Sequence, residues 1–197
     1  MVAVPATLPP FVARVERVTA SDLPYSWHSG CPVRPSQLRR VHLSFIGFDS
    51  ERHLGALVVN ARVVPQVTVV FRTLYRARFP IRRMQPIDAY RGNDDRSAAA
   101  DNTSGFNCRN AVASGPKSWS MHAYGEAIDV NDLENPYLLG SRVIPPAGKA
   151  YLDRTNVRPG MAVDGGVLVR AFASVGWGWG GHFAGTPDYQ HFSTNGR

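Results

Sequence analysis

The sequence contains two cysteines and no long apolar run. Two cysteines cannot by themselves build a closed structural zinc site, because such sites are usually thiolate-rich and have four protein ligands. No stretch is long enough to span a bilayer, so membrane insertion is not expected. The opening residues Met1 to Pro5 lack a basic segment and an uninterrupted apolar run, so no signal peptide is visible.

The sequence also lacks internal repeats, low-complexity segments and a nucleic-acid-binding signature. The net charge is +7 and the pI is near 9.9, which favours anionic surroundings such as nucleic acid, a membrane surface or a bacterial wall. The arginines are spread along the chain, and the adjacent pairs include Arg39–Arg40 and Arg82–Arg83. We therefore expect no nucleic-acid partner, although charge alone does not choose among the other anions.

The composition is that of an ordinary folded protein, with 44% hydrophobic and 19% charged residues over 197 positions. This length predicts a single domain. We also expect a monomer, although the length does not indicate the oligomeric state. We expect residues 1–30 to form a leader packed on the surface and residues 31–197 to form the domain. The 18 glycines and 15 prolines predict a loop-rich fold.

Alternating apolar residues from Val41, followed by a turn and the apolar run from Leu54 to Val59, predict a β-hairpin. After Asn60, apolar residues recur at helical spacing up to Leu74, and Pro80 prevents the helix from continuing. Residues 81–90 look extended. The next thirty residues are rich in Asp, Asn, Ser, Gly and Ala, and predict a long irregular segment with one short helix.

Further elements are expected in the C-terminal half. They are a strand at residues 127–130, a helix at residues 167–175 that ends at Gly176, and a short strand at residues 190–192. The predicted class is α+β, with a small antiparallel sheet flanked by helices and an open groove for a metal.

The most informative stretch places His122 seven residues before Asp129, with Gly125 between them. Seven is not a helical ligand spacing, but a turn carrying His122 can fold back onto a strand carrying Asp129. Near the C-terminus, Asp188 precedes His191 by three residues. His122, Asp129 and His191 would supply three ligands to one Zn²⁺ ion and leave an open position, which is typical of catalytic zinc.

Asp188 is the candidate carboxylate that takes a proton from the attacking water and delivers it to the leaving amine. Residues three apart on a regular strand face opposite sides, so Asp188 must lie at a bend if His191 is a ligand. The preceding Pro187 makes a bend reasonable. Trp177 and Trp179 fit either a substrate groove or a buried pair.

The pattern Ser-x-His-x-x-Gly-x-Ala-x-Asp, which begins at Ser120, resembles the M15 metallopeptidases of peptidoglycan. Those enzymes also end with an acidic residue three positions before a histidine. By this resemblance, Arg91 in Asp-Ala-Tyr-Arg orients the substrate and supports transition-state charge, and Ser120 contacts the substrate. A disulfide between Cys31 and Cys108 is likewise implied by the resemblance, since secreted relatives carry both cysteines.

The resemblance implies zinc-dependent hydrolysis of peptide bonds in peptidoglycan stem peptides, either as an L-Ala–D-Glu endopeptidase or as a D-Ala–D-Ala carboxypeptidase. The expected location is extracellular or in the cell wall, as a mature secreted protein or as a phage lysin released by a holin. One alternative is a catalytically silent, zinc-holding binding module of the cell wall. Another is a phosphate-polymer-binding protein in which zinc is structural.

Overall fold

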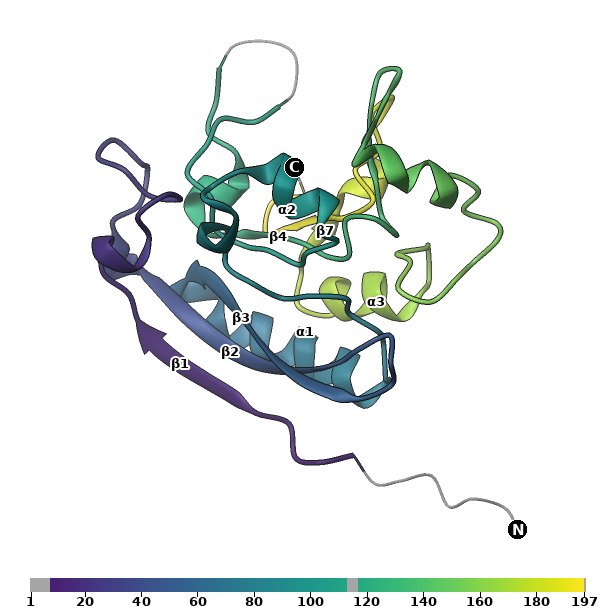
Figure 1. The fold of residues 1–197 in the computed structure, drawn as a ribbon, viewed down its shortest axis with the longest axis horizontal. Coiled ribbons are helices and arrows are strands. Elements are labelled where there is room, and N and C mark those ends of the chain that lie inside the picture. The colour runs from purple at the N-terminus through teal and green to yellow at the C-terminus, as the bar shows by residue number, and fades with distance from the viewer. Residues whose placement is uncertain (1–7, 113–116, 197) are drawn as a thin grey trace.

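The structure is a computed structural model that describes residues 8–112 and 117–196. Its helices and strands form two layers (Figure 1). The first layer contains the sheet β1–β2–β3 and helix α1, and the second contains short strands, long connections and helices α2 and α3. Antiparallel strands and separate helices make the fold α+β, as predicted.

The first sheet is built on the predicted hairpin, with β2 at Leu38–Ile46 and β3 at Arg52–Asn60. The two strands pair along their full length, from Leu38 opposite Asn60 to Ile46 opposite Arg52. A third strand, β1 (Ala13–Arg17), pairs antiparallel with β2 at the sheet edge. The expected leader therefore contributes a strand to this sheet, and residues 1–7 of it lie outside the described residues.

Helix α1 (Val64–Arg76) follows β3 through the short 3-10 helix η3 (Ala61–Val63). The Asn60 side chain caps η3 by accepting a hydrogen bond from the Arg62 amide. The apolar stripe of α1 is buried against β2, as its spacing predicted, and includes Val67, Val70, Phe71 and Leu74.

The predicted extended segment is only partly extended. The Ile81 amide donates to the Ile46 carbonyl of β2, and the Met84 carbonyl accepts from the Ala56 amide of β3, but residues 87–90 form the 3-10 helix η4 (Ile87–Tyr90). The expectation of an extended chain was wrong for these four residues. A 3-10 turn forms here because the Pro86 ring and the following short turn hydrogen bonds favour a tight, local conformation.

The second sheet has the order β4–β8–β7, with bounds Ala127–Asp129, His191–Ser193 and Gly178–Trp179. Its first two strands and helix α3 (Val167–Ala173) correspond to predicted elements. The two sheets are linked through the segment at residues 103–106. Within it, Ser104 bridges Asp129, and the Phe106 amide donates to the Val58 carbonyl at 2.7 Å.

The long segment after residue 90 contains helix α2 (Asp94–Ala99), which is the short helix expected there. The sequence patterns did not predict the small hairpin of β5 (Tyr137–Leu139) and β6 (Arg142–Ile144). The remaining 3-10 helices are η1 (Ala20–Asp22), η2 (Pro35–Gln37), η5 (Met121–Tyr124), η6 (Pro146–Tyr151) and η7 (Gly180–His182).

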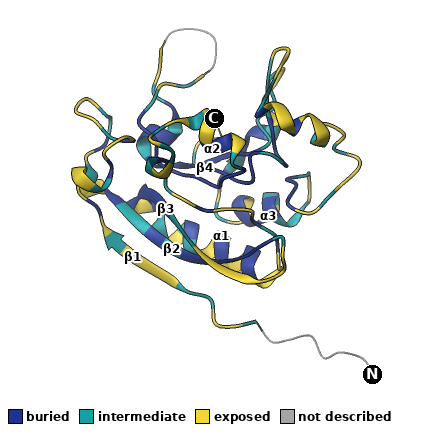
Figure 2. Cartoon of the chain, in the orientation of Figure 1, coloured by how far each residue is buried: buried dark blue, intermediate teal, exposed yellow. Residues whose placement is uncertain are grey.

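Buried residues concentrate between the layers, while the outer strand β1 and the tips of the connections are exposed (Figure 2). The main core joins the inner faces of β2, β3 and α1 to α3 and the second sheet. Trp177 and Trp179 belong to this core, so the buried reading of that pair holds. Among the described helices, none is long and apolar enough to cross a membrane.

Candidate metal centre

Three potential ligands meet on the second sheet. His122 lies in η5, Asp129 ends β4, and His191 begins β8 directly opposite Asp129 in the strand register. Paired residues of antiparallel strands place their side chains on the same face, which explains why Asp129 and His191 meet although they are 62 positions apart. The turn that carries His122 adds the third group.

Gly125 makes this turn possible. It has a left-handed conformation, with φ at +68°, which returns the chain from η5 to β4. A Cβ atom at this position would lie 2.6 Å from the Asn60 amide nitrogen, so the first layer also leaves no room for a side chain. A glycine is therefore required both by the turn and by the packing of the two layers.

The ligand atoms of the three side chains converge closely. His122 Nε2 lies 3.1 Å from an Asp129 oxygen and 3.2 Å from His191 Nδ1, and His191 Nδ1 lies 3.1 Å from the other Asp129 oxygen. Each residue is at most 7% exposed. Two imidazole nitrogens and a carboxylate in so small a volume form a donor set suited to a transition-metal cation.

A hydrogen bond fixes the orientation of His122. Its Nδ1 atom lies 2.7 Å from the Gly105 carbonyl oxygen, which can only accept, so Nδ1 carries the proton. In a neutral ring, the lone pair is then on Nε2 and points toward Asp129 and His191. Metal-binding histidines are commonly held in this way by a carbonyl behind the ring.

The carboxylate of Asp129 is held in its charged form. Burial raises its pKa, but the adjacent His122 and His191 rings outweigh this effect and leave the pKa below its usual value. Asp129 is therefore an anionic donor across the ordinary pH range, as a metal ligand must be.

Asp188 lies at a bend beside this cluster. The His191 amide donates to the Asp188 carbonyl at 3.2 Å, which closes a turn over residues 188–191, so both side chains can approach the same centre. One carboxylate oxygen of Asp188, Oδ1, is buried and has no hydrogen-bond partner among the described residues. Burial and the charge of Asp129 raise the pKa of Asp188 to about 7.

The cluster opens into a pocket of about 900 Å³. One wall comes from the segment that contains Arg109 and Trp119, another from α2, and a third from the β5–β6 hairpin. His122, Asp129, Asp188 and His191 all line it. The pocket is large enough for a short peptide, since small-molecule sites commonly measure about 300–1,000 Å³.

Arg91 does not line this pocket. It follows η4 in a left-handed conformation, with φ at +56°, and is exposed. Arg109 lines the pocket instead, and its side chain is 27% exposed. It forms an ion pair with Asp94, whose other oxygen accepts a 2.7 Å hydrogen bond from Asn107 Nδ2.

Ser120 lies at the pocket and also caps η5. Its Oγ accepts a hydrogen bond from the His122 amide at 3.3 Å, and the residue is 7% exposed. The Ser120 amide donates to the Arg109 carbonyl at 3.1 Å. The serine thus connects the candidate ligand His122 with the wall that carries Arg109.

Cys31 and Cys108 form a disulfide with a Cα–Cα separation of 5.8 Å. The bond anchors the residue before Arg109 to the N-terminal part of the chain, 77 positions away. His28 lies next to the same sulfur atoms, and its Nε2 is 3.5 Å from the Cys108 sulfur. Because the two sulfurs are bonded to each other, His28, Cys31 and Cys108 are a poor metal-binding group. The better candidate is the group of His122, Asp129 and His191.

Asp132 is a pocket residue that the sequence reasoning did not single out. It is 4% exposed, and its Oδ1 atom is buried without a hydrogen-bond partner in the described part of the chain. Burial and the neighbouring Asp129 raise its pKa well above the usual value. Its place three residues after Asp129 was a usable signal, since a turn directly after a ligand strand stays close to the site.

Residues 114–194, which are less than half of the chain, match a family model described as D-alanyl-D-alanine carboxypeptidase. The matching model is one of the M15 peptidases, so the resemblance recognised in the sequence is confirmed over this segment. The matched segment includes His122, Asp129, Asp188 and His191. Comparison with curated proteins and with solved structures gave no match.

Proposed function

We propose that this protein is a zinc-dependent peptidase that hydrolyses peptide bonds in peptidoglycan stem peptides. The observation that carries the proposal is the convergence of His122, Asp129 and His191 beside Asp188 at the base of one pocket. Three protein donors leave a position open for reaction, unlike a structural site closed by four. The match to a peptidase family over residues 114–194 supports the same conclusion.

The donor set fits zinc, because two neutral imidazoles and one carboxylate are ligands that this ion accepts. When bound, zinc supplies Lewis-acid chemistry that polarises the substrate carbonyl and makes a water molecule more acidic. His122 Nε2, His191 Nδ1 and the Asp129 carboxylate would hold the ion. The Gly105 carbonyl would keep the His122 ring in the tautomer that ligation needs.

Asp188 is the proposed proton carrier. Its unpartnered, buried oxygen can accept a proton from the attacking water and then donate that proton to the nitrogen of the leaving amine. A pKa of about 7 suits both steps, since the group can release and take up a proton near neutral pH. The charge of a bound cation would lower this pKa.

Arg109 is the proposed substrate-binding arginine, in place of Arg91. Its guanidinium group lines the pocket and is held in place by Asp94. A guanidinium can donate two parallel hydrogen bonds to a carboxylate, which suits the free C-terminus of a peptide. We therefore favour the D-Ala–D-Ala carboxypeptidase activity, which agrees with the description of the matching family model.

The wall of a bacterium is the proposed place of action. The net charge of +7 favours attraction to a polyanionic wall, and an oxidising extracellular compartment suits the disulfide between Cys31 and Cys108. A mature secreted enzyme and a phage lysin both meet these conditions.

The function is tested by incubating the zinc-loaded protein with purified muropeptides and analysing the products by mass spectrometry. Loss of one terminal D-alanine is the expected result, and release of the stem after L-alanine would instead identify an endopeptidase. The control variants are His122→Ala and Asp188→Ala, which should give no product. If the folded, metal-loaded protein leaves every muropeptide intact, the binding-module alternative replaces the peptidase.

A further inference from the structure

A second pocket of about 480 Å³ adjoins the candidate metal centre. The two pockets share Asp95, Arg142 and Ile144 as lining residues, so they are neighbouring parts of one surface depression. The ligand residues line the larger pocket and not the smaller one. The smaller pocket therefore lies beside the reacting centre, where a longer substrate would extend.

The β5–β6 hairpin connects this second pocket to Asp188. Tyr137 in β5 forms a β-bridge with Asp188, and the Leu138 amide donates to the Pro187 carbonyl at 2.8 Å. Arg142 and Ile144, which β6 carries, are thus attached through the hairpin to the segment of the proposed proton carrier. A substrate held by this hairpin would be positioned relative to Asp188.

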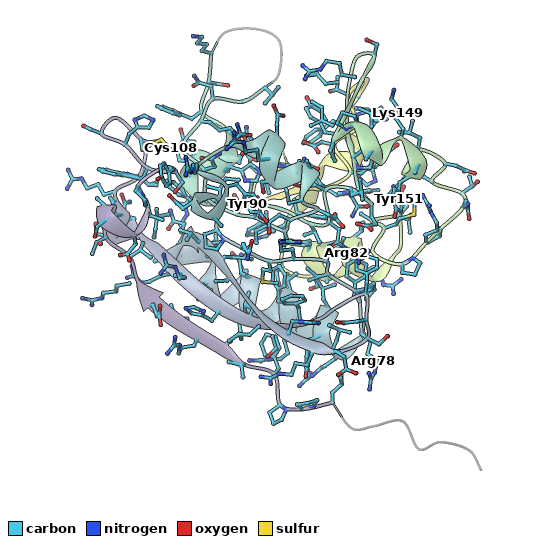
Figure 3. The ribbon with its side chains drawn as sticks, viewed as in Figure 1. Arg78, Arg82, Tyr90, Cys108, Lys149 and Tyr151 are labelled. Carbon is cyan, nitrogen blue, oxygen red and sulfur yellow. A yellow bond between two sulfur atoms is a disulfide. The ribbon has the colours of Figure 1, made fainter. Side chains whose placement is uncertain are left out.

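A carboxypeptidase removes a single C-terminal residue, so every other residue of its substrate lies on the acyl side of the scissile bond. Figure 3 shows Lys149 on the opposite side of the second layer from Cys108. With its C-terminal carboxylate at Arg109, a substrate that extends from the larger pocket into the second one would place acyl-side residues beside Arg142 and Lys149. The second pocket then receives residues that precede the scissile bond.

The chemistry of the second pocket favours an anion. Arg142 and Lys149 line it, both are exposed, and neither forms an ion pair with a described residue. Asp95 is the single acidic residue in the lining. Ile144 and Pro145 supply an apolar surface against which the stem of a side chain can pack.

We infer that this second pocket is an accessory substrate site for a carboxylate-bearing residue on the acyl side of the scissile bond, with Arg142 and Lys149 as its cationic contacts. The inference rests on the proposed function. Both side chains are solvent-exposed, so their contacts with the substrate should be weak. Together they should lower the dissociation constant by about tenfold. The accessory site should affect binding and leave the chemical step alone.

The test uses peptides that end in D-Ala–D-Ala and carry a glutamate one, two or three residues before the scissile bond, each matched by a glutamine peptide. For the unmodified enzyme, at least one glutamate peptide should have a KM about tenfold below that of its glutamine partner. The double variant Arg142→Gln/Lys149→Gln should remove this preference without changing kcat. The double variant Arg17→Gln/Arg76→Gln, which removes equal charge away from both pockets, should retain it.

Dissociation constants for the same peptides, measured by calorimetry on the zinc-loaded Asp188→Asn variant, make the test independent of hydrolysis. Failure of the proposed function would appear as absent product, whereas the accessory site would still appear as tighter binding of a glutamate peptide. Equal affinities for all glutamate and glutamine pairs would overturn the inference. So would a preference that survives in Arg142→Gln/Lys149→Gln or disappears equally in the control.

Discussion

The two halves of the chain differ in charge and in what they bury. Residues 1–92 contain 13 Lys and Arg residues and 5 Asp and Glu residues, whereas residues 93–197 contain 9 and 10. Among the described residues, the buried polar side chains of the first half are Ser26, Ser44 and Asn60. The second half buries many more, including His122, His191 and the carboxylates of Asp129 and Asp132 at the same pocket.

This difference suggests that the first half mainly stabilises the fold, whereas the second half carries the candidate site. The first half contains β2, β3 and α1, which bury apolar stripes, and its arginines are not buried. The second half buries Asp129, Asp132 and one carboxylate oxygen of Asp188, although burying a carboxylate is unfavourable unless a cation or a hydrogen bond compensates. Buried acids at a pocket are expected where a cation binds and protons move.

The largest effect is expected from removal of a ligand in the second half. His122→Ala should abolish zinc binding at this site and reduce hydrolysis to the background rate, because two remaining donors hold the ion poorly. Metal content by mass spectrometry and product formation by chromatography measure the two losses. A variant that still hydrolyses muropeptides at the original rate would refute the ligand assignment.

Substitution of the proton carrier should have the next largest effect. Asp188→Asn should retain zinc and lower kcat by about 10²–10⁴-fold, since this is the usual contribution of a general acid–base group. Steady-state kinetics with metal analysis of the same sample separates this result from that of His122→Ala. A loss of zinc together with activity would instead make Asp188 a ligand.

The pH profile gives a second readout of Asp188. A base must be deprotonated, so kcat/KM should rise with pH through the pKa of Asp188. Burial raises that pKa to about 7, and a bound cation lowers it, so the acidic limb of the profile should lie at or below pH 7. The residual activity of Asp188→Asn should lack this limb.

A cavity made in the core of the first half should lower stability and leave catalysis unchanged. Leu74 lies on the buried face of α1 and is 1% exposed. Leu74→Ala should lower the free energy of unfolding by about 2–5 kcal/mol. Chemical denaturation measures this loss, while kcat per folded molecule at low temperature should stay the same. A large fall in kcat with unchanged stability would contradict the division between the halves.

The smallest expected loss of kcat/KM distinguishes Arg109 from Arg91 as the substrate-binding arginine. Arg109→Gln should lower kcat/KM by about 10–100-fold, as expected when a hydrogen bond to a charged group is lost. Arg91→Gln should change kcat/KM by less than about twofold, because an exposed side chain outside the pocket contributes little. The opposite ranking in parallel kinetics would return the substrate-binding role to Arg91.

The sequence predicted the elements that have a clear period. The β2–β3 hairpin and α1 are long enough for alternation or helical spacing to appear, and both were found. β1 and the β5–β6 hairpin were not predicted: their strands are short, like β4 and β8, but they lack the metal-ligand motifs that drew attention to those two strands. Their formation depends on partners distant in sequence, as β1 shows by pairing with β2.

The candidate site was predictable to the extent that a local motif fixes it. The spacing of His122 and Asp129 and the pair Asp188 and His191 indicated which side chains to bring together, and the structure brings them together. The place of an arginine is harder to predict, because the direction of a long side chain depends on the surrounding turns. Arg91 ends a 3-10 helix and is exposed, whereas Arg109 is held at the pocket by Asp94.

The most direct test of the metal centre is X-ray absorption spectroscopy at the zinc edge of the zinc-loaded protein, with His191→Ala as the control. The ligand set of His122, Asp129 and His191 predicts two imidazole nitrogens and oxygen neighbours at about 2.0–2.2 Å, with one imidazole lost in the control. Sulfur neighbours at about 2.3 Å, or a spectrum that His191→Ala leaves unchanged, would contradict the account.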